Sequence, residues 1–289
     1  MPRASANGIE LEYDTFGSEG DPAVVCISGL GAQMITYHED FCRALADRGY
    51  FVVRHDNRDV GLSTKIEARP ERPSERDHGS SYTLSDMAAD TAGLLDALGI
   101  AAAHVVGVSM GGMIAQTLAI EHPTRVLSLT SIMSTTGQPG VGGATEEAMA
   151  RLVARPGESR EERVASSIET SRVIWGDTPQ FPFDEELARW RAETSVDRCY
   201  YPEGTGRQML AIRATGDRTE KLRRLSVPTL VIHGTNDPLV QPSGGEATAA
   251  AIPGAELLLI EGMGHGVARP AFDTIVTAID RLASRAGDA

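Results

Sequence analysis

The sequence predicts an α/β fold in which a mostly parallel sheet carries helices on both faces. Short continuous apolar runs alternate with helical stretches through the first half of the chain, and such runs are typical of strands buried on both faces. The alternation stops near residue 135 and resumes near residue 225. A serine between two glycines follows one apolar run, and the carboxyl ends of parallel strands are where functional side chains gather.

The composition excludes several classes of partner. The chain has 289 residues, 41% of them hydrophobic, which is enough for a large buried core. Its formal net charge of −13 argues against nucleic acid or anionic membrane as partners, because both need basic surfaces. Residues 1–13 lack an apolar run of signal-peptide length, and we expect no membrane span. Cys26, Cys42 and Cys199 lack metal-ligand spacing, so we expect reduced thiols and a cytoplasmic location.

The first part of the chain is expected to alternate strands and helices behind an edge strand. Residues 8–14 alternate apolar and polar side chains, as a half-exposed edge strand does. Thr83, with Asp86 three residues later, forms the capping pattern that starts a helix ended by Gly99. The buried strands are predicted over residues 23–27, 50–54, 104–108 and 125–132, and the helices over residues 37–48, 83–98 and 113–121. This order predicts parallel pairing.

Residues 136–224 are predicted to form a helical cap inserted into a core domain of residues 1–135 and 225–289. Strand-like runs vanish in this insertion and charged residues crowd in, with helices expected over residues 145–154 and 184–194. The core then resumes with a strand over residues 228–233, a helix that includes residues 247–252, a strand over residues 255–260 and an amphipathic helix from residue 272.

The segment Gly107-Val108-Ser109-Met110-Gly111 has the G-x-S-x-G pattern of a nucleophile elbow, a sharp turn between a strand and a helix. Glycine is expected on both sides of the serine because a Cβ there would collide with the neighbouring chain. The helix that follows points its free N–H groups at the same spot. The pattern also arises by chance, so the prediction depends on the strand before it, the helix after it and partners downstream.

A serine hydroxyl needs a base to act as a nucleophile, and the base is usually a histidine oriented by a carboxylate. Asp237 follows the predicted strand 228–233, and His265 follows the predicted strand 255–260. The carboxyl ends of parallel strands share one edge of the sheet, so Ser109, Asp237 and His265 are expected to converge there. We expect a catalytic triad in which Ser109 attacks, His265 is the base and Asp237 orients it.

In these motifs the chain resembles the α/β hydrolases over nearly its whole length. The motifs are Gly107-Val108-Ser109-Met110-Gly111-Gly112, His233-Gly234-Thr235-Asn236-Asp237-Pro238 and Gly262-Met263-Gly264-His265. Residues 56–63 are similar to the family's D-x-R-G-x-G-x-S loop, although Asp59 stands where the pattern has glycine. Within the family, the chain resembles aclacinomycin methylesterase-like enzymes and actinobacterial serine esterases and lipases.

The oxyanion hole is expected from two backbone N–H groups, one from the residue after the nucleophile, Met110, and one from the loop after the strand 23–27. The resemblance implies that Leu30 supplies the second donor. The family often has His-Gly before this position, where the chain has Ser28-Gly29. This departure keeps the backbone donor and changes how the loop is braced.

These observations lead to a serine hydrolase that cleaves a carboxylic ester of a small or medium apolar substrate through an acyl-enzyme. Neither a cofactor nor a metal is expected, and the partner is a small-molecule ester. Some of the cap aromatics are expected to contact substrate while others form the core of the cap. The candidates are Trp175, Phe181, Phe183 and Trp190.

Alternatives stay open for the function and for single residues. The same triad could serve perhydrolysis of the haloperoxidase type, lactone opening or C–C bond hydrolysis, and the fold could also serve a non-catalytic ligand-binding protein. A homodimer is left open. Asp217 is a second candidate acid, but no strand-like run precedes it. His104 is expected to pack at a strand end, and His233 lacks the further ligands of a metal motif. The histidines expected in solvent or behind the site are His38, His55, His78 and His122.

Overall fold

A single sheet organises the computed structural model, which describes residues 1–66, 81–154 and 157–287. Within these residues, eight strands pair in the order β1-β2-β4-β3-β5-β6-β7-β8. The strands are β1 (Arg3–Ala6), β2 (Ile9–Phe16), β3 (Ala23–Ile27), β4 (Phe51–His55), β5 (Ala103–Val108), β6 (Val126–Ile132), β7 (Thr229–Gly234) and β8 (Glu256–Ile260). All pairs from β4 to β8 are parallel, which confirms the predicted mostly parallel sheet.

The antiparallel end of the sheet corrects one prediction. Strand β2 pairs with β4 on one side and with β1 on the other, so it is not the edge strand. The edge is β1, four residues long, whose sequence Arg-Ala-Ser-Ala carries little hydrophobic pattern. Asn7 and Gly8, both at positive φ (50° and 78°), join the two strands. An Asn-Gly pair is a typical two-residue hairpin connection, and the sequence therefore did contain a signal for this turn.

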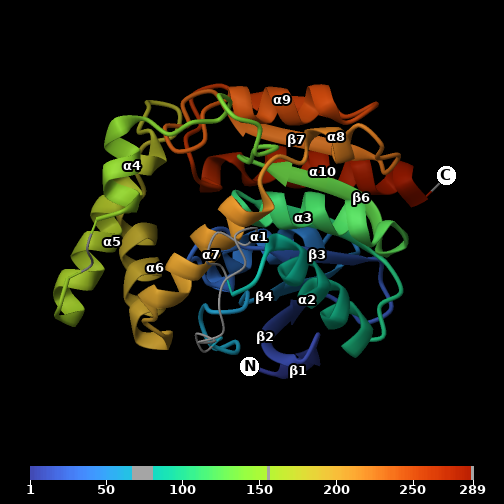
Figure 1. Ribbon diagram of the computed structural model, residues 1–289, viewed down its shortest axis with the longest axis horizontal. Helices are drawn as coiled ribbons and strands as arrows, with labels where there is room; N and C mark the ends of the chain where they lie inside the picture. The colour runs from blue at the N-terminus through green and yellow to red at the C-terminus, as the bar shows by residue number, and fades with distance from the viewer. Residues whose placement is uncertain (67–80, 155–156, 288–289) are drawn as a thin grey trace.

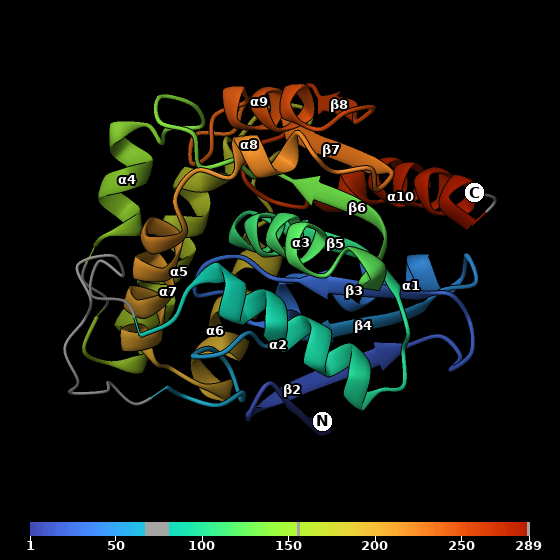
Figure 2. The same ribbon diagram turned by 45° about the vertical axis from the view of Figure 1, so that its right-hand side comes forward.

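Helices cover both faces of the sheet (Figures 1 and 2). They are α1 (Glu39–Ala46), α2 (Leu84–Ala97), α3 (Met110–Glu121), α9 (Ser243–Ala251) and α10 (Phe272–Gly287). Residues of α2, α3 and α9 share one buried apolar cluster with Val25 of β3, whereas α1 and α10 share a second cluster with Val24. Adjacent residues of β3 thus point to opposite faces, and both faces are buried, as its continuous apolar run predicts.

Between β6 and β7 the chain forms a group of helices at one end of the sheet. They are α4 (Glu146–Leu152), α5 (Arg160–Trp175), α6 (Glu185–Arg198), α7 (Pro202–Thr215) and α8 (Thr219–Leu222). Figure 1 shows α4, α5 and α6 on the left, the side toward which the arrows of β6 and β7 point, and Figure 2 shows α7 near the start of α2. The helices α4 to α7 therefore lie on the side where residues that follow parallel strands emerge. No helix in the described part of the chain is long and apolar enough to cross a membrane.

Candidate active site

Ser109 occupies a strained turn between β5 and α3. Its backbone has φ 57° and ψ −121°, a conformation that side chains other than glycine rarely adopt. The N–H of Ser109 donates to the Ile132 carbonyl at 2.9 Å, which ties the turn to the neighbouring strand β6. A Cβ at Gly107 would lie 2.2 Å from the Gly111 carbonyl oxygen, and one at Gly111 would lie 1.9 Å from the Ile27 carbonyl oxygen. The steric need for both glycines, predicted from the motif, is confirmed.

Ser109, His265 and Asp237 form one hydrogen-bonded chain. The Ser109 Oγ lies 3.0 Å from His265 Nε2, and His265 Nδ1 lies 2.7 Å from Asp237 Oδ2. When Nδ1 donates to the carboxylate, Nε2 is left with a lone pair that can accept the serine proton. The structure thus brings together three residues that are far apart in the sequence and that follow different parallel strands.

Asp237 is buried and fully engaged. Its Oδ1 accepts the backbone N–H groups of Leu239 and Val240, each at 2.9 Å, while Oδ2 faces His265 and lies 3.4 Å from His233 Nε2. Burial alone would raise the pKa of the Asp237 carboxyl. The two histidines and the Val240 N–H outweigh burial, and the pKa is lowered to about 2. Asp237 is therefore an anion at neutral pH, as a group that stabilises a histidine cation must be.

The loop that carries His265 is fastened to the end of α5. The His265 N–H donates to the Ile174 carbonyl at 2.9 Å. A Cβ at Gly264 would lie 1.7 Å from the Trp175 carbonyl oxygen, and one at Gly266 would lie 3.0 Å from the Trp175 ring. Two glycines thus let the histidine loop approach this helix closely, which places the His265 backbone against the end of α5.

The two expected oxyanion donors belong to segments that border Ser109. Met110 is the first residue of α3, so its N–H has no acceptor within the helix. Leu30 lies in the turn 29–32, which is closed by a bond from the Ala32 N–H to the Gly29 carbonyl at 3.2 Å. A Cβ at Gly29 would lie 3.2 Å from the Ser109 Cβ, so this turn packs directly on the serine.

The candidate aromatic residues between positions 175 and 190 divide into a group and an outlier. Trp175 and Phe181 are 7% and 8% exposed, and the Trp175 indole N–H donates to the Phe181 carbonyl at 3.0 Å. Phe183 meets the Trp175 ring edge-on, with 6.0 Å between ring centroids. Trp190 is 37% exposed and lies edge-on to the His38 ring, 5.2 Å away. Trp175 therefore joins the histidine loop to the aromatic group, whereas Trp190 packs against a different segment.

The remaining candidate residues have other surroundings. Asp217 accepts hydrogen bonds from the N–H and hydroxyl of Thr219 at 2.9 and 2.6 Å, so its carboxylate binds a neighbour in the sequence and no histidine among the described residues. His104 packs as expected, with Nδ1 2.9 Å from the Ser128 hydroxyl. His55 is 1% exposed, so of the two surroundings expected for it, in solvent or behind the site, solvent is excluded. His78 lies outside the described residues, among which no cluster of three metal-ligating side chains occurs.

The loop 56–63 explains why the chain departs from the family pattern at Asp59. This residue has φ 69°, a conformation that favours glycine but that aspartate tolerates better than most residues. Its carboxylate accepts two hydrogen bonds from Arg207 of α7, at 2.8 and 3.0 Å. In the same loop Asp56 pairs with Arg198 of α6 at 3.0 Å. Sequence reasoning missed these arginines, because pairs more than 140 residues apart leave no local pattern.

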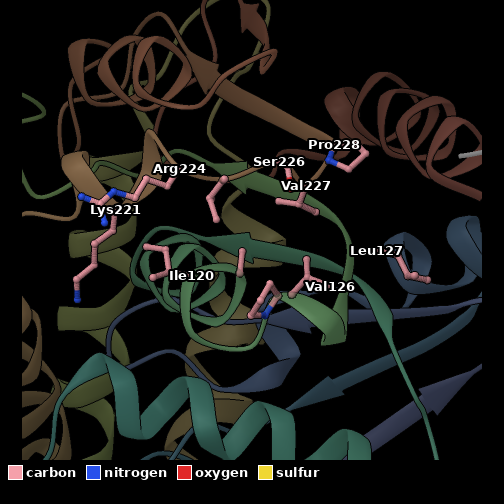
Figure 3. A pocket seen from close by; sticks show the side chains of 11 residues that line it. Ile120, Val126, Leu127, Lys221, Arg224, Ser226, Val227 and Pro228 are labelled. Carbon is pink, nitrogen blue, oxygen red and sulfur yellow. The ribbon is translucent and has the colours of Figure 1, made fainter.

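A surface hollow of about 470 Å³ lies apart from this site. Figure 3 shows its lining side chains where α3 ends and where β6 and β7 begin, among them Ile120, Val126 and Pro228. Ser109, Asp237 and His265 follow the carboxyl ends of strands. The hollow is at the amino ends and does not belong to the same site.

Comparisons with known proteins agree with this architecture. Residues 22–268 match the family described as alpha/beta hydrolase fold. The chain is 27% identical to rhodomycin D methylesterase DnrP of Streptomyces peucetius, over 94% of both proteins. It is 29% identical to 3-oxoadipate enol-lactonase 2 of Acinetobacter baylyi, over 89% of this chain and 87% of that one.

Solved structures show the same fold. The meta-cleavage product hydrolase CumD of Pseudomonas fluorescens IP01 superposes with a TM-score of 0.77 and 22% identity, over 99% of this chain and 98% of that one. Its sheet and helices correspond to those described here. At 22% sequence identity, this likeness is evidence for the fold alone. The family match spans most of the sequence, from the start of β3 to the loop beyond His265. The chain therefore belongs to the alpha/beta hydrolase fold family.

Proposed function

We propose that this protein is a serine hydrolase that cleaves a carboxylic ester of a small or medium apolar substrate through an acyl-enzyme. The observation that carries the proposal is the hydrogen-bonded chain from Ser109 through His265 to Asp237, with distances of 3.0 and 2.7 Å. A histidine held in one tautomer by a buried anion is what a serine hydroxyl needs to become a nucleophile. The relatives named above, a methylesterase and a lactonase, support hydrolysis of an ester bond.

In the first half of the reaction, the Ser109 Oγ attacks the ester carbonyl carbon while His265 Nε2 takes the hydroxyl proton. Asp237 stabilises the resulting histidine cation. The Leu30 and Met110 N–H groups hold the oxyanion, each contributing roughly 3 kcal/mol to transition-state stability. The tetrahedral intermediate then expels the alcohol, which receives its proton from His265, and the acyl group stays on Ser109.

Water completes the cycle. The water oxygen attacks the acyl carbon while His265 removes a proton from the water. When the second tetrahedral intermediate collapses, His265 returns that proton to the Ser109 oxygen and the acid leaves. All proton transfers pass through His265 Nε2, so the reaction calls for no metal or cofactor. The same residues would open a lactone, whose leaving alcohol stays attached to the acyl group, and the lactonase relative keeps that reaction as a second candidate.

The proposed preference for an apolar substrate rests on the aromatic side chains of the proposed cap. Residues 136–224 are taken as a helical cap over the carboxyl edge of the sheet, where Trp175, Phe181 and Phe183 gather beside the histidine loop. Apolar rings next to a polar catalytic chain suit an ester with an apolar acyl or alcohol group. The rhodomycin D methylesterase relative favours a methyl ester within this class. The cytoplasmic location stays a prediction from the sequence, and a homodimer stays open.

The proposal is tested with a small panel of substrates and one inhibitor. The protein should release a phenol from aryl esters of short acids and methanol from methyl esters of apolar acids. A serine-reactive phosphonate should abolish turnover and add its mass at Ser109. Ser109→Ala is the matched control, which should neither turn over ester nor take up the label. A wild-type protein that binds such esters without cleaving them would instead be a ligand-binding member of the fold. Faster turnover of lactones than of open esters would favour the second candidate.

A further inference from the structure

Gln208 of α7 links two loops of the core to the cap. Its side chain is fully buried, and both ends of its amide are used. The Oε1 accepts the Gly31 N–H at 2.8 Å, and the Nε2 donates to the Arg58 carbonyl at 2.8 Å. Gly31 belongs to the turn next to Ser109, whereas Arg58 belongs to the loop after β4. A single cap side chain therefore fixes the position of one core loop relative to the other.

The turn that Gln208 holds contains the expected oxyanion donor. The Gly29 carbonyl accepts the Ala32 N–H at 3.2 Å, so the peptide between Gly29 and Leu30 points its oxygen into the turn. Because a trans peptide places its N–H opposite its carbonyl, the Leu30 N–H points out of the turn. The next peptide carries the Gly31 N–H, and Gln208 binds that group. The orientation of the Leu30 N–H thus depends on a turn whose central peptide is held from the cap.

The helix that supplies Gln208 is itself fastened to the same loops. Arg207 donates two hydrogen bonds to the Asp59 carboxylate, at 2.8 and 3.0 Å. A Cβ at Gly31 would lie 2.7 Å from the Thr205 hydroxyl, and one at Gly204 would lie 2.0 Å from the Asp59 carbonyl oxygen. These contacts leave α7 little room to move relative to the turn. Gln208 is therefore a fixed anchor for the Gly31 N–H.

We infer that Gln208 is a positioning residue for ester hydrolysis, which holds the Leu30 N–H where the oxyanion forms. The inference rests on the proposed function, because it assigns the Leu30 N–H to that step. An oxyanion hole stabilises charge that develops in the transition state, so its donors must be in place before the reaction. A shift of the turn would weaken the hydrogen bond to the oxyanion and change ground-state binding little. Loss of Gln208 should therefore lower kcat and leave KM nearly unchanged.

A purely structural role for Gln208, as a fastener of α7, makes a different prediction. Loss of a fastener would lower stability and disturb the cap, and any other contact of α7 with the core would serve as well. Thr215 supplies the matched contact. It is the last residue of α7, seven positions after Gln208, and its hydroxyl oxygen accepts the Leu84 N–H at 3.0 Å. Thr215→Val removes that bond while keeping the shape of the side chain.

The experiment compares Gln208→Met with Thr215→Val. Methionine keeps the length and helix propensity of glutamine but has no amide. We expect Gln208→Met to lower kcat by roughly tenfold or more, since misplacement of a donor costs less than its loss, which is about 10²- to 10³-fold. An aryl boronic acid, which forms a tetrahedral adduct on serine, should lose affinity by a similar factor, while KM stays within about twofold. Thr215→Val should leave all three values unchanged. Wild-type kcat and boronate affinity in Gln208→Met would overturn the inference.

Two further measurements keep the outcome decisive. Gln208→Asn retains the amide but is too short to reach Gly31, and it replaces the methionine variant if that variant does not fold, with the same expected losses. Hydrogen exchange of residues 28–34 separates this inference from the proposed function. Faster exchange in the Gln208 variant than in Thr215→Val supports the hold on the turn even if the wild-type protein cleaves no ester. Equal exchange in the two variants overturns it.

Discussion

The Ser109 Oγ lies 3.0 Å from His265 Nε2, and Ser109 reaches this position through a backbone that strains every residue except glycine. Its φ of 57° and ψ of −121° are imposed by the neighbouring chain, through the bond to Ile132 and the close contacts of Gly107 and Gly111. Such a conformation costs about 1–3 kcal/mol. The backbone conformation that positions the proposed nucleophile thus lowers the stability of the folded protein. Unfolding measurements can test this without a substrate.

Two substitutions at Ser109 separate its chemistry from its strain. Ser109→Ala and Ser109→Gly should both fold and lose nearly all ester hydrolysis, because neither has a hydroxyl. Glycine accepts the positive φ freely, so Ser109→Gly should be more stable than Ser109→Ala by up to roughly 1 kcal/mol in urea unfolding. Ester turnover by Ser109→Ala above about a tenth of wild type would move the nucleophile elsewhere. A glycine variant less stable than the alanine variant would show that the strain is not felt.

Asp237→Asn should lower kcat by orders of magnitude. The amide would favour the wrong histidine tautomer, and the same change in a serine protease costs roughly 10⁴-fold. Asp217→Asn is the control, since Asp217 bonds to Thr219 and has no contact with His265 among the hydrogen bonds of the described residues. Its kcat should stay within about twofold of wild type. Steady-state kinetics on one aryl ester decide the matter, and a crippled Asp217 variant beside an active Asp237 variant would reverse the assignment.

Local patterns predict the parts of this molecule that depend on neighbours in sequence. The elbow around Ser109 and the strand ends before Asp237 and His265 are local signals. The rule that parallel strands end at one edge turns those signals into a prediction that the three residues meet. The helix cap formed by Thr83 and Asp86 is likewise local, and the 2.8 Å bond between the Thr83 N–H and the Asp86 carboxylate confirms it.

Other features depend on contacts that no local pattern records. Gln208 binds the Gly31 N–H across 177 positions of sequence, and glutamine in a helix has no signature for such a role. His55 is buried at the end of β4, and its place in the sequence could not distinguish this from exposure to solvent. Strand β1 went unpredicted because four small or polar residues carry little periodicity, although Asn7 and Gly8 marked the turn. Long-range packing therefore explains why Gln208 and the burial of His55 were not predicted, whereas β1 was missed because its local pattern is weak.

The buried His55 makes stability depend on pH. Burial lowers the pKa of His55 from 6.5 to about 4, against an opposing influence of Asp56. Between these values the unfolded chain binds a proton that the folded protein does not, so stability falls as the pH decreases from 6.5 toward 4, by up to about 3 kcal/mol. His55→Leu cannot titrate and should lose this part of the pH dependence. Urea unfolding of both proteins at pH 7 and pH 4.5 measures the difference, and equal slopes with pH would contradict the prediction.

The last prediction concerns substrate preference and compares Phe183 with Trp190. Phe183 is half-buried and meets Trp175, which in turn packs over Gly266 beside His265. Trp190 is 37% exposed and rests against His38. If the aromatic group by the histidine loop contacts the acyl or alcohol chain, loss of one ring removes roughly 1–3 kcal/mol of apolar contact from long substrates and little from short ones.

Phe183→Ala should therefore shift the ratio of kcat/KM between octanoate and acetate aryl esters by about tenfold or more toward acetate, while turnover of the acetate ester persists. Trp190→Ala is the matched control, since it also removes an aromatic ring from the segment between β6 and β7, and its profile should equal that of the wild type. The measurement is a chain-length series for the three proteins, with thermal unfolding alongside. A Phe183 variant that loses stability but keeps the wild-type profile would give Phe183 a packing role only. A shift confined to the Trp190 variant would instead place the substrate near Trp190 and His38, at the start of α1.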